Sequence, residues 1–220
     1  MIVLASNSPR RRELLALGGW QFSVLPALVD ESVLPDDSAR GYVLRTSLRK
    51  ARAAQRLMSA GVGVERFIVA CDTAVVDGCD ILGKPSDSAQ ARAMLLRLRG
   101  RVHQVFSALS IIDLEDGAFE QDVCVTDVPM RNYSDDEMKT YVASGDPMDK
   151  AGAYAIQHPG FKPVLDMQGC YANVMGLPLC HLTRSMKKLG IDPGKDVPQA
   201  CQDELDFTCP VYNRILNGEL

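Results

Sequence analysis

The chain has 220 residues, of which 46% are hydrophobic and 24% charged, and its net charge is −4. This length suggests one large domain or two small lobes, with enough residues to bury a substantial core. The composition excludes collagen-like and disordered chains, and no apolar run approaches the ~20 residues that a membrane span needs. The apolar start carries no basic leader of the kind that signal peptides have. We therefore expect a cytoplasmic protein without a membrane partner.

The charge is unevenly distributed along the chain. Residues 191–220 contain six acidic and two basic side chains and so account for the whole net charge, while residues 1–190 are neutral. A neutral body argues against a broad basic face and hence against a nucleic-acid partner. We expect a domain over residues 1–190 and an acidic, Pro-containing C-terminal tail over 191–220, which we interpret as a flexible extension rather than a docked segment.

The seven cysteines are an odd number and include no Cys-x-x-Cys pair, which favours reduced thiols over disulfides or a structural zinc site.

The helices and strands are predicted from hydrophobic patterns and capping residues, with Ser8 as the N-cap and Pro9 as the first residue of the opening helix. Strands alternate with helices early and pair as hairpins in the middle, which predicts an α/β fold with a mixed sheet. In chain order we expect a strand over 2–5, a helix over 9–17, a strand over 22–25, a helix over 39–57, strands over 67–71, 73–76 and 81–82, a helix over 86–98, strands over 102–113 and 122–131, and helices over 134–143 and 179–189.

The first candidate site is the start of the opening helix. Free amide hydrogens and the positive dipole end of a helix N-terminus suit a phosphate group, and an arginine there adds two parallel hydrogen bonds. Arg10 and Arg11 lie nearest the cap. Successive helix positions point about 100° apart, so Arg10, Arg11 and Arg12 cannot all face one ligand. The competing interpretation is a solvated run of arginines.

The second candidate is Asp72, which is followed by Thr73 and interrupts an apolar segment. A carboxylate in a buried strand is costly unless it is paired, bound to metal or functional, although an edge-strand position or a turn cap would explain it equally well. Lys84 follows on a tight loop, where most lysines simply face solvent. Two glycine-punctuated loops, residues 149–157 and 169–178, are interpreted as packed against the core.

Together these motifs resemble the Maf family of nucleoside triphosphate pyrophosphatases. Five segments match in family order over residues 2 to 190: 4–11 (LASNSPRR), 72–73 (DT), 81–85 (ILGKP), 149–157 (DKAGAYAIQ) and 173–178 (NVMGLP). The resemblance implies a two-lobed α/β fold around an elongated mixed sheet, of the Maf and ITPase type, with the nucleotide in a cleft between the lobes. It also implies a homodimer.

The resemblance implies hydrolysis between the α and β phosphates, which gives the monophosphate and pyrophosphate and requires Mg²⁺ or Mn²⁺. Asp72 matches the family's proton-accepting aspartate. Arg10, Thr73 and Gln157 match positions that distinguish the branch preferring dTTP and UTP, so modified pyrimidine nucleotides are further candidate substrates. The remaining matches face the phosphates or the metal: Ser8, Arg11, Lys50 and Lys84 for phosphate, and Glu31 with Asp72 for metal.

Three positions depart from the family pattern. Val102 stands where a threonine is common, Cys71 replaces a small residue, and His158 replaces the glycine after Gln157. The alternatives to an enzyme are a nucleotide sensor that binds without hydrolysis and a partner-binding regulator of septum formation in cell division.

Overall fold

The computed structural model describes residues 1–58 and 65–220. Its strands join one sheet in the order β2-β1-β3-β5-β6, with β4 added beside β3. β1 pairs in parallel with β2 and β3, and the remaining pairs are antiparallel. The predicted mixed α/β fold is therefore confirmed. The strands are β1 (Ile2–Leu4), β2 (Phe22–Val24), β3 (Phe67–Asp77), β4 (Asp80–Leu82), β5 (Val102–Asp113) and β6 (Phe119–Pro129).

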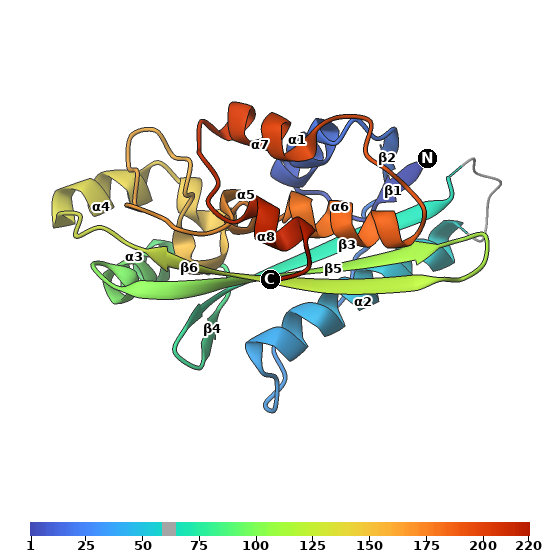
Figure 1. Ribbon diagram of the computed structural model, residues 1–220. Coiled ribbons are helices and arrows are strands. Elements are labelled where there is room, and N and C mark those ends of the chain that lie inside the picture. Colours follow the sequence, from blue (N-terminus) through green and yellow to red (C-terminus); the bar gives the residue numbers. More distant parts are fainter. Residues whose placement is uncertain (59–64) are drawn as a thin grey trace.

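The helices form a layer on each side of the sheet (Figure 1). α2 runs along one side against β3 and β5, while α1 and α5 to α8 lie on the other. α3, α4 and the two 3₁₀ turns gather at one end. The helices are α1 (Pro9–Leu17), α2 (Ala39–Met58), α3 (Ser88–Leu98), α4 (Asp135–Ala143), η1 (Asp146–Asp149), η2 (Ala151–Ala153), α5 (Tyr171–Val174), α6 (Leu179–Lys188), α7 (Val197–Leu205) and α8 (Tyr212–Leu216).

β3 is one continuous buried strand, where the sequence predicted two segments on either side of Asp72. Its side chains alternate between the faces, as strand geometry requires. Val69, Cys71 and Val75 belong to the core beneath α1 and α6. Ala70 lies on the opposite face, in the core beneath α2. The same alternation puts Asp72 on the α2 face.

The pairing of β3 leaves its middle open along one edge. β1 pairs with it only as far as Val69, and β4 begins to pair at Val75. Between these points the strand is bonded to β5 alone. The parallel strands β1 and β2 end at this gap, and ligands of open α/β sheets bind just outside the ends of such strands. The gap therefore puts Asp72 and Thr73 where a ligand can reach them.

The C-terminal segment is docked, so the prediction of a flexible extension is wrong. Residues 197–205 and 212–216 form α7 and α8, and Val197 and Ile215 are almost completely buried in the main core. The sequence pattern did not predict these two short amphipathic helices, because their apolar residues are scattered among prolines and acidic residues. The division of the chain at residue 190 remains a proposal.

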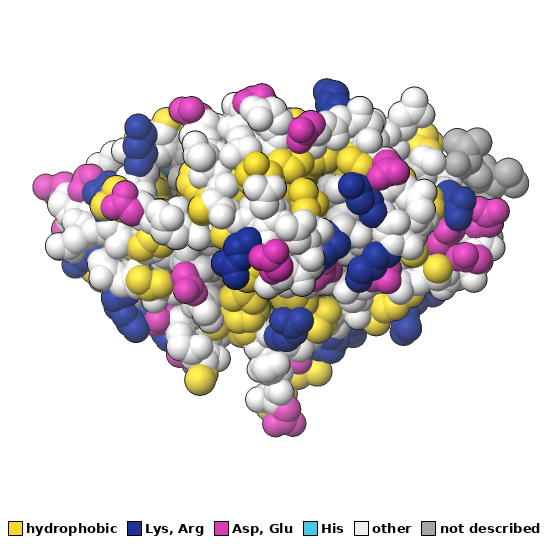
Figure 2. Space-filling model, in the orientation of Figure 1, with side chains coloured by type: hydrophobic (Ala, Val, Ile, Leu, Met, Phe, Trp, Pro, Cys, Tyr) yellow, Lys and Arg dark blue, Asp and Glu magenta, His cyan; other side chains and the backbone are white. Residues whose placement is uncertain are grey.

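The visible face of the molecule mixes basic and acidic side chains around scattered apolar ones (Figure 2). All seven cysteines are free thiols. Across residues 1–58 and 65–220, no helix combines the length and the apolar character that a membrane crossing requires.

Candidate active site

A cleft of about 470 Å³ opens at the gap beside β3. It is lined by eight of the nine residues that the sequence singled out, which come from five separate parts of the chain. Gln157 is the exception. The eight are Ser8, Arg10, Arg11, Glu31, Lys50, Asp72, Thr73 and Lys84.

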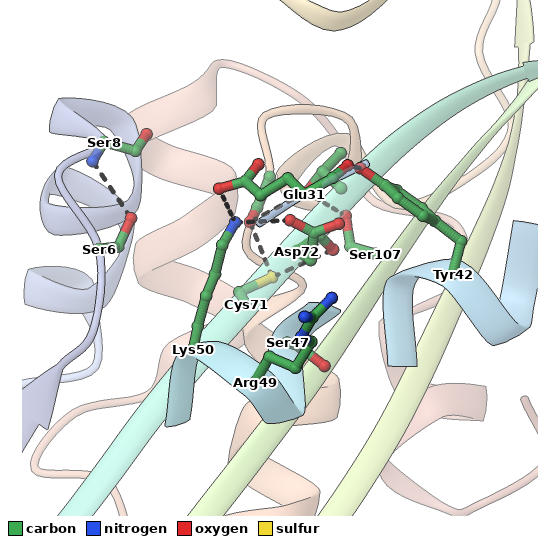
Figure 3. Close-up of polar contacts among 12 residues, drawn as sticks. Ser6, Ser8, Glu31, Tyr42, Ser47, Arg49, Lys50, Cys71, Asp72 and Ser107 are labelled. Atoms are coloured by element: carbon green, nitrogen blue, oxygen red, sulfur yellow. Dashed lines mark hydrogen bonds and ion pairs between the residues drawn. The ribbon is translucent and has the colours of Figure 1, made fainter. Parts of the chain in front are cut away.

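Asp72 lies at the floor of the cleft beside Lys50 of α2 (Figure 3). The Lys50 Nζ atom is 2.6 Å from Oδ1 of Asp72 and 2.9 Å from Oε1 of Glu31. Both Asp72 and Lys50 are buried, whereas the Glu31 side chain is half exposed. The second carboxylate oxygen of Asp72, Oδ2, is buried without a hydrogen-bond partner. One oxygen is thus fixed by the ammonium group and the other is left for a ligand.

The environment of Asp72 raises its pKa above the ordinary value. Burial is the main cause, because it penalises the charged form, while Lys50 and then Arg11 pull the pKa in the other direction. A carboxylate with a raised pKa accepts a proton more readily at neutral pH than a solvated one does. The chemistry available at this position is that of a general base held next to a cation.

Glu31 lies on a loop that α2 holds in place. Tyr42 donates its hydroxyl to the Glu31 carbonyl at 3.0 Å, and Arg45 and Arg49 bind the carbonyls of the two neighbouring residues at 3.1 Å each. These three helix residues are spaced three and four apart and so share one face of α2. The helix that supplies Lys50 therefore also positions Glu31.

The N-terminus of α1 forms another wall. Ser8 caps the helix by accepting from the Arg11 amide, as predicted, and Pro9 is its first residue. Arg10 and Arg11 line the cleft, whereas Arg12 does not. The Arg11 guanidinium donates to the Gly176 carbonyl at 2.8 Å and to the Thr73 hydroxyl at 3.1 Å. Arg11 is thus fixed across the floor of the cleft.

Thr73 lies on the opposite face of β3 from Asp72 and joins a hydroxyl network. Its Oγ1 atom is 2.8 Å from Oγ of Ser107, and the Ser107 hydroxyl donates to the Asn173 carbonyl at 3.2 Å. Gly176 has a φ of +106°, and a Cβ there would lie 3.4 Å from the Thr73 hydroxyl. No sequence motif pointed to Ser107. Gly176, within the segment 173–178, was the signal for the close approach to Thr73.

Lys84 enters the cleft from the loop after β4, which is tied down by a hydrogen bond from the Gly152 amide to the Gly83 carbonyl at 3.1 Å. The segment 149–157 adds Asp149, Lys150 and Tyr154 to the lining, although the sequence analysis assigned them no role. Lys150 pairs with Asp149 at 2.7 Å. Its charge is therefore partly neutralised, and Lys84 is the freer cation on this wall.

Gln157 is exposed and lines a separate, smaller pocket beside α1. The structure therefore does not place Gln157 with the other predicted residues.

Of the positions that depart from the family pattern, Cys71 is buried and donates its thiol to the Gly176 carbonyl at 3.1 Å. Val102 is exposed, and His103 is buried with Nε2 at 2.8 Å from the hydroxyl of Tyr154. The roles of all these residues remain predictions.

Two carboxylates are available for a divalent cation. Oδ2 of Asp72 lacks a protein partner, and Glu31 is close enough to share Lys50 with it. No group of three or more acidic, His or Cys side chains that could hold a metal is found in residues 1–58 and 65–220. Mg²⁺ is commonly held by one or two carboxylates together with substrate phosphates and water. The residues present fit that arrangement.

Comparison with known proteins agrees with these motifs, because residues 1–189 match the Maf-like protein family. The chain belongs to this family. A Dehalococcoides mccartyi protein named dTTP/UTP pyrophosphatase is 40% identical over 217 residues, which cover 98% of this chain and 94% of that relative. Proteins of the same name from a Geobacter species and from Hahella chejuensis are 41% and 40% identical, each over 86% of this chain and over 95% and 92% of their own lengths.

The Dehalococcoides match extends into the C-terminal segment, whereas the family match ends at residue 189. Among solved structures, the Staphylococcus aureus Ham1 protein aligns with a TM-score of 0.40 and 14% identity over 74% of this chain and 79% of that chain.

Proposed function

We propose that this member of the Maf-like family is a nucleoside triphosphate pyrophosphatase that hydrolyses dTTP and UTP to the monophosphate and pyrophosphate. The observation that carries the proposal is the buried Asp72, which lines a cleft together with Arg10, Arg11, Lys50 and Lys84 and has one carboxylate oxygen without a protein partner. The names of the relatives support the two substrates.

Phosphoanhydride hydrolysis depends on an oriented water and on neutralising the charge of the phosphate oxygens. Asp72 is the proton acceptor for the attacking water, and Lys50 holds its Oδ1 atom. The helix N-terminus at Ser8 and the guanidinium of Arg10 bind phosphate oxygens, and Lys84 balances the charge that develops on the departing pyrophosphate. Arg11 acts from the floor of the cleft while it holds Thr73.

Glu31 and Asp72 are the residues that would hold Mg²⁺ or Mn²⁺. A bound divalent cation would supply charge neutralisation at the phosphates and polarise the water. Lys50 binds both carboxylates and so offsets part of the repulsion between them.

The test measures pyrophosphate release from the common nucleoside triphosphates with Mg²⁺ or Mn²⁺, for the wild type and for Asp72→Asn. We expect dTTP and UTP to be hydrolysed at least about tenfold faster than purine nucleotides, and the variant to lose ~10²–10⁴-fold in kcat, the usual contribution of a general base. Activity of Asp72→Asn within tenfold of wild type would overturn the mechanism. Tight nucleotide binding without pyrophosphate release would favour a sensor.

A further inference from the structure

Beside the cleft lies a second pocket of about 170 Å³, which contains Gln157. It combines residues from α1, from the loop after η2, from α5 and its C-terminal end, and from α7 of the docked C-terminal segment. Its lining residues are Glu13, Leu14, Leu17, Gln157, Tyr171, Met175, Glu204 and Leu205.

Three parts of the chain lead from the cleft into this pocket. Arg10 lines the cleft, while Glu13, Leu14 and Leu17 line the pocket, and these spacings of three, four and seven put all four on one face of α1. Tyr154 lines the cleft and Gln157, three residues later, lines the pocket. Met175 lines both. The two hollows are therefore neighbouring parts of one surface.

Their chemistry differs. The cleft is lined by five cations and three carboxylates, whereas the described residues that line the pocket include no Lys or Arg and supply three polar side chains, Glu13, Gln157 and Glu204. Its other walls are apolar or aromatic. Two carboxylates repel a triphosphate, but they accept hydrogen bonds from a neutral ring that presents N–H groups. Leucine, methionine and tyrosine side chains offer the apolar contact that the faces of such a ring require.

The C-terminal segment is held firmly against this pocket. The Gly194 amide donates to the Gly18 carbonyl at the end of α1 at 2.9 Å, and Trp20 donates to the Asp192 carbonyl at 3.3 Å. Val197, the first residue of α7, is 1% exposed. α7 thus lies beside α1 (Figure 1). Glu204, near the C-terminal end of α7, is an exposed side chain at the rim of the pocket.

We propose that the pocket binds the pyrimidine ring of the substrate and that Glu204 is a specificity-determining residue contributed by the C-terminal segment. This inference rests on the proposed function. The Glu204 carboxylate accepts the ring N–H that lies between the two carbonyl groups of uracil and thymine. Cytosine presents a bare nitrogen acceptor at that ring position, which the carboxylate repels. Recognition therefore depends on a helix that lies outside the span of the family match.

The experiment compares steady-state kinetics of the full-length wild type, Glu204→Gln and Asp203→Asn with UTP, dTTP and CTP. Asp203 is the matched control, since it is an exposed acid on the same helix that bonds to Gln199 at 2.7 Å and does not line the pocket. We expect Glu204→Gln to raise KM for UTP and dTTP about tenfold, with kcat within about twofold and a smaller preference for UTP over CTP. The glutamine oxygen accepts the ring N–H more weakly than a carboxylate does, in the ground state and the transition state alike, and the glutamine amide can donate to the bare ring nitrogen of CTP.

Inorganic triphosphate, which has no base, serves as a competitive inhibitor of UTP hydrolysis. Its inhibition constant should be the same in Glu204→Gln and wild type, because the variant leaves the basic cleft intact. An unchanged KM and an unchanged preference for UTP over CTP in Glu204→Gln, or an equal change in Asp203→Asn, would overturn the inference. If the wild type hydrolyses no triphosphate, the proposed function fails. The inference is then decided by calorimetric titration of UTP, and equal Kd values for wild type and Glu204→Gln would overturn it.

Discussion

β3 carries two buried aspartates, five residues apart, that are used in different ways. Asp77, at the end of the strand, is fully paired: Arg97 binds its Oδ2 atom at 2.6 Å and Arg101 binds its Oδ1 atom at 3.1 Å. Asp72, in the middle, has one oxygen on Lys50 and the other without a partner. Both are less than 10% exposed, so burial alone does not separate them. An unpaired carboxylate oxygen in a residue that lines a cleft is what distinguishes the candidate catalytic group from the structural one.

The largest expected effect comes from exchanging the two carboxylates for amides in turn. Asp72→Asn should reduce kcat by ~10³-fold, in the range of general bases, and change stability by less than about 1 kcal/mol, because Lys50 keeps Glu31 and because burial already disfavours the Asp72 charge. Asp77→Asn should retain activity within about threefold and lose about 2 kcal/mol of stability, since two partly exposed arginines lose a charged acceptor.

Pyrophosphate release and urea unfolding of the same two proteins provide the measurements. An Asp77→Asn variant that unfolds like the wild type, or an Asp72→Asn variant that is strongly destabilised, would show that the distinction between paired and unpaired oxygens is wrong.

The next comparison sets Arg10 against Arg11. Arg11 is tied to Gly176 and Thr73, whereas Arg10 lines the cleft without a hydrogen bond to any described residue. Arg11→Ala should therefore lower kcat/KM by ~100-fold and also reduce stability by about 1–2 kcal/mol, because it removes three hydrogen bonds, to Gly176, Thr73 and Ser6, and the proposed phosphate contact. Arg10→Ala should raise KM about tenfold and leave the unfolding midpoint unchanged. Equal effects of the two variants on the unfolding midpoint would contradict this assignment.

Much of the fold was predictable because local signals were strong. Ser8, Asp87 and Ser134 each cap a helix, and the helices begin within two residues of the predicted starts, at Pro9, Ser88 and Asp135. The strand predicted over 102–113 also has the span that the structure shows. The break predicted at Asp72 was wrong because a buried carboxylate resembles a chain interruption until its partner is known, and Lys50 lies 22 residues away.

The candidate site could be predicted only through the resemblance. No pattern in the sequence indicates that α2 and the loop at Glu31 meet the middle of β3, since the open edge between β1 and β4 arises from tertiary pairing. The docking of α7 was missed for the same reason, because its anchor is the end of α1. The separation of Gln157 from the cleft likewise depends on how segment 149–157 folds around η2.

The smallest expected effect concerns unpaired atoms that lie away from the cleft. Nδ1 of His103 and Nδ1 of His181 are also buried without partners, and burial lowers the pKa of each histidine to about 4, from an ordinary value of 6.5. The unfolded chain therefore binds these protons more readily, so the free energy of unfolding falls as the pH drops from 6.5 toward 4. Between pH 7 and pH 5.5 the loss should be about 1 kcal/mol for each histidine.

Urea unfolding at pH 7 and pH 5.5 measures this loss directly. His103→Gln should remove about half of the histidine contribution to the pH dependence, and the double variant with His181→Gln nearly all of it, whatever their stability at pH 7. An identical pH dependence in the wild type and the double variant would show that the two imidazoles are not held neutral by burial. Because neither histidine lines the cleft, the unpaired nitrogens should affect stability alone, and this separates them from Oδ2 of Asp72, where the same lack of a partner is expected to control turnover.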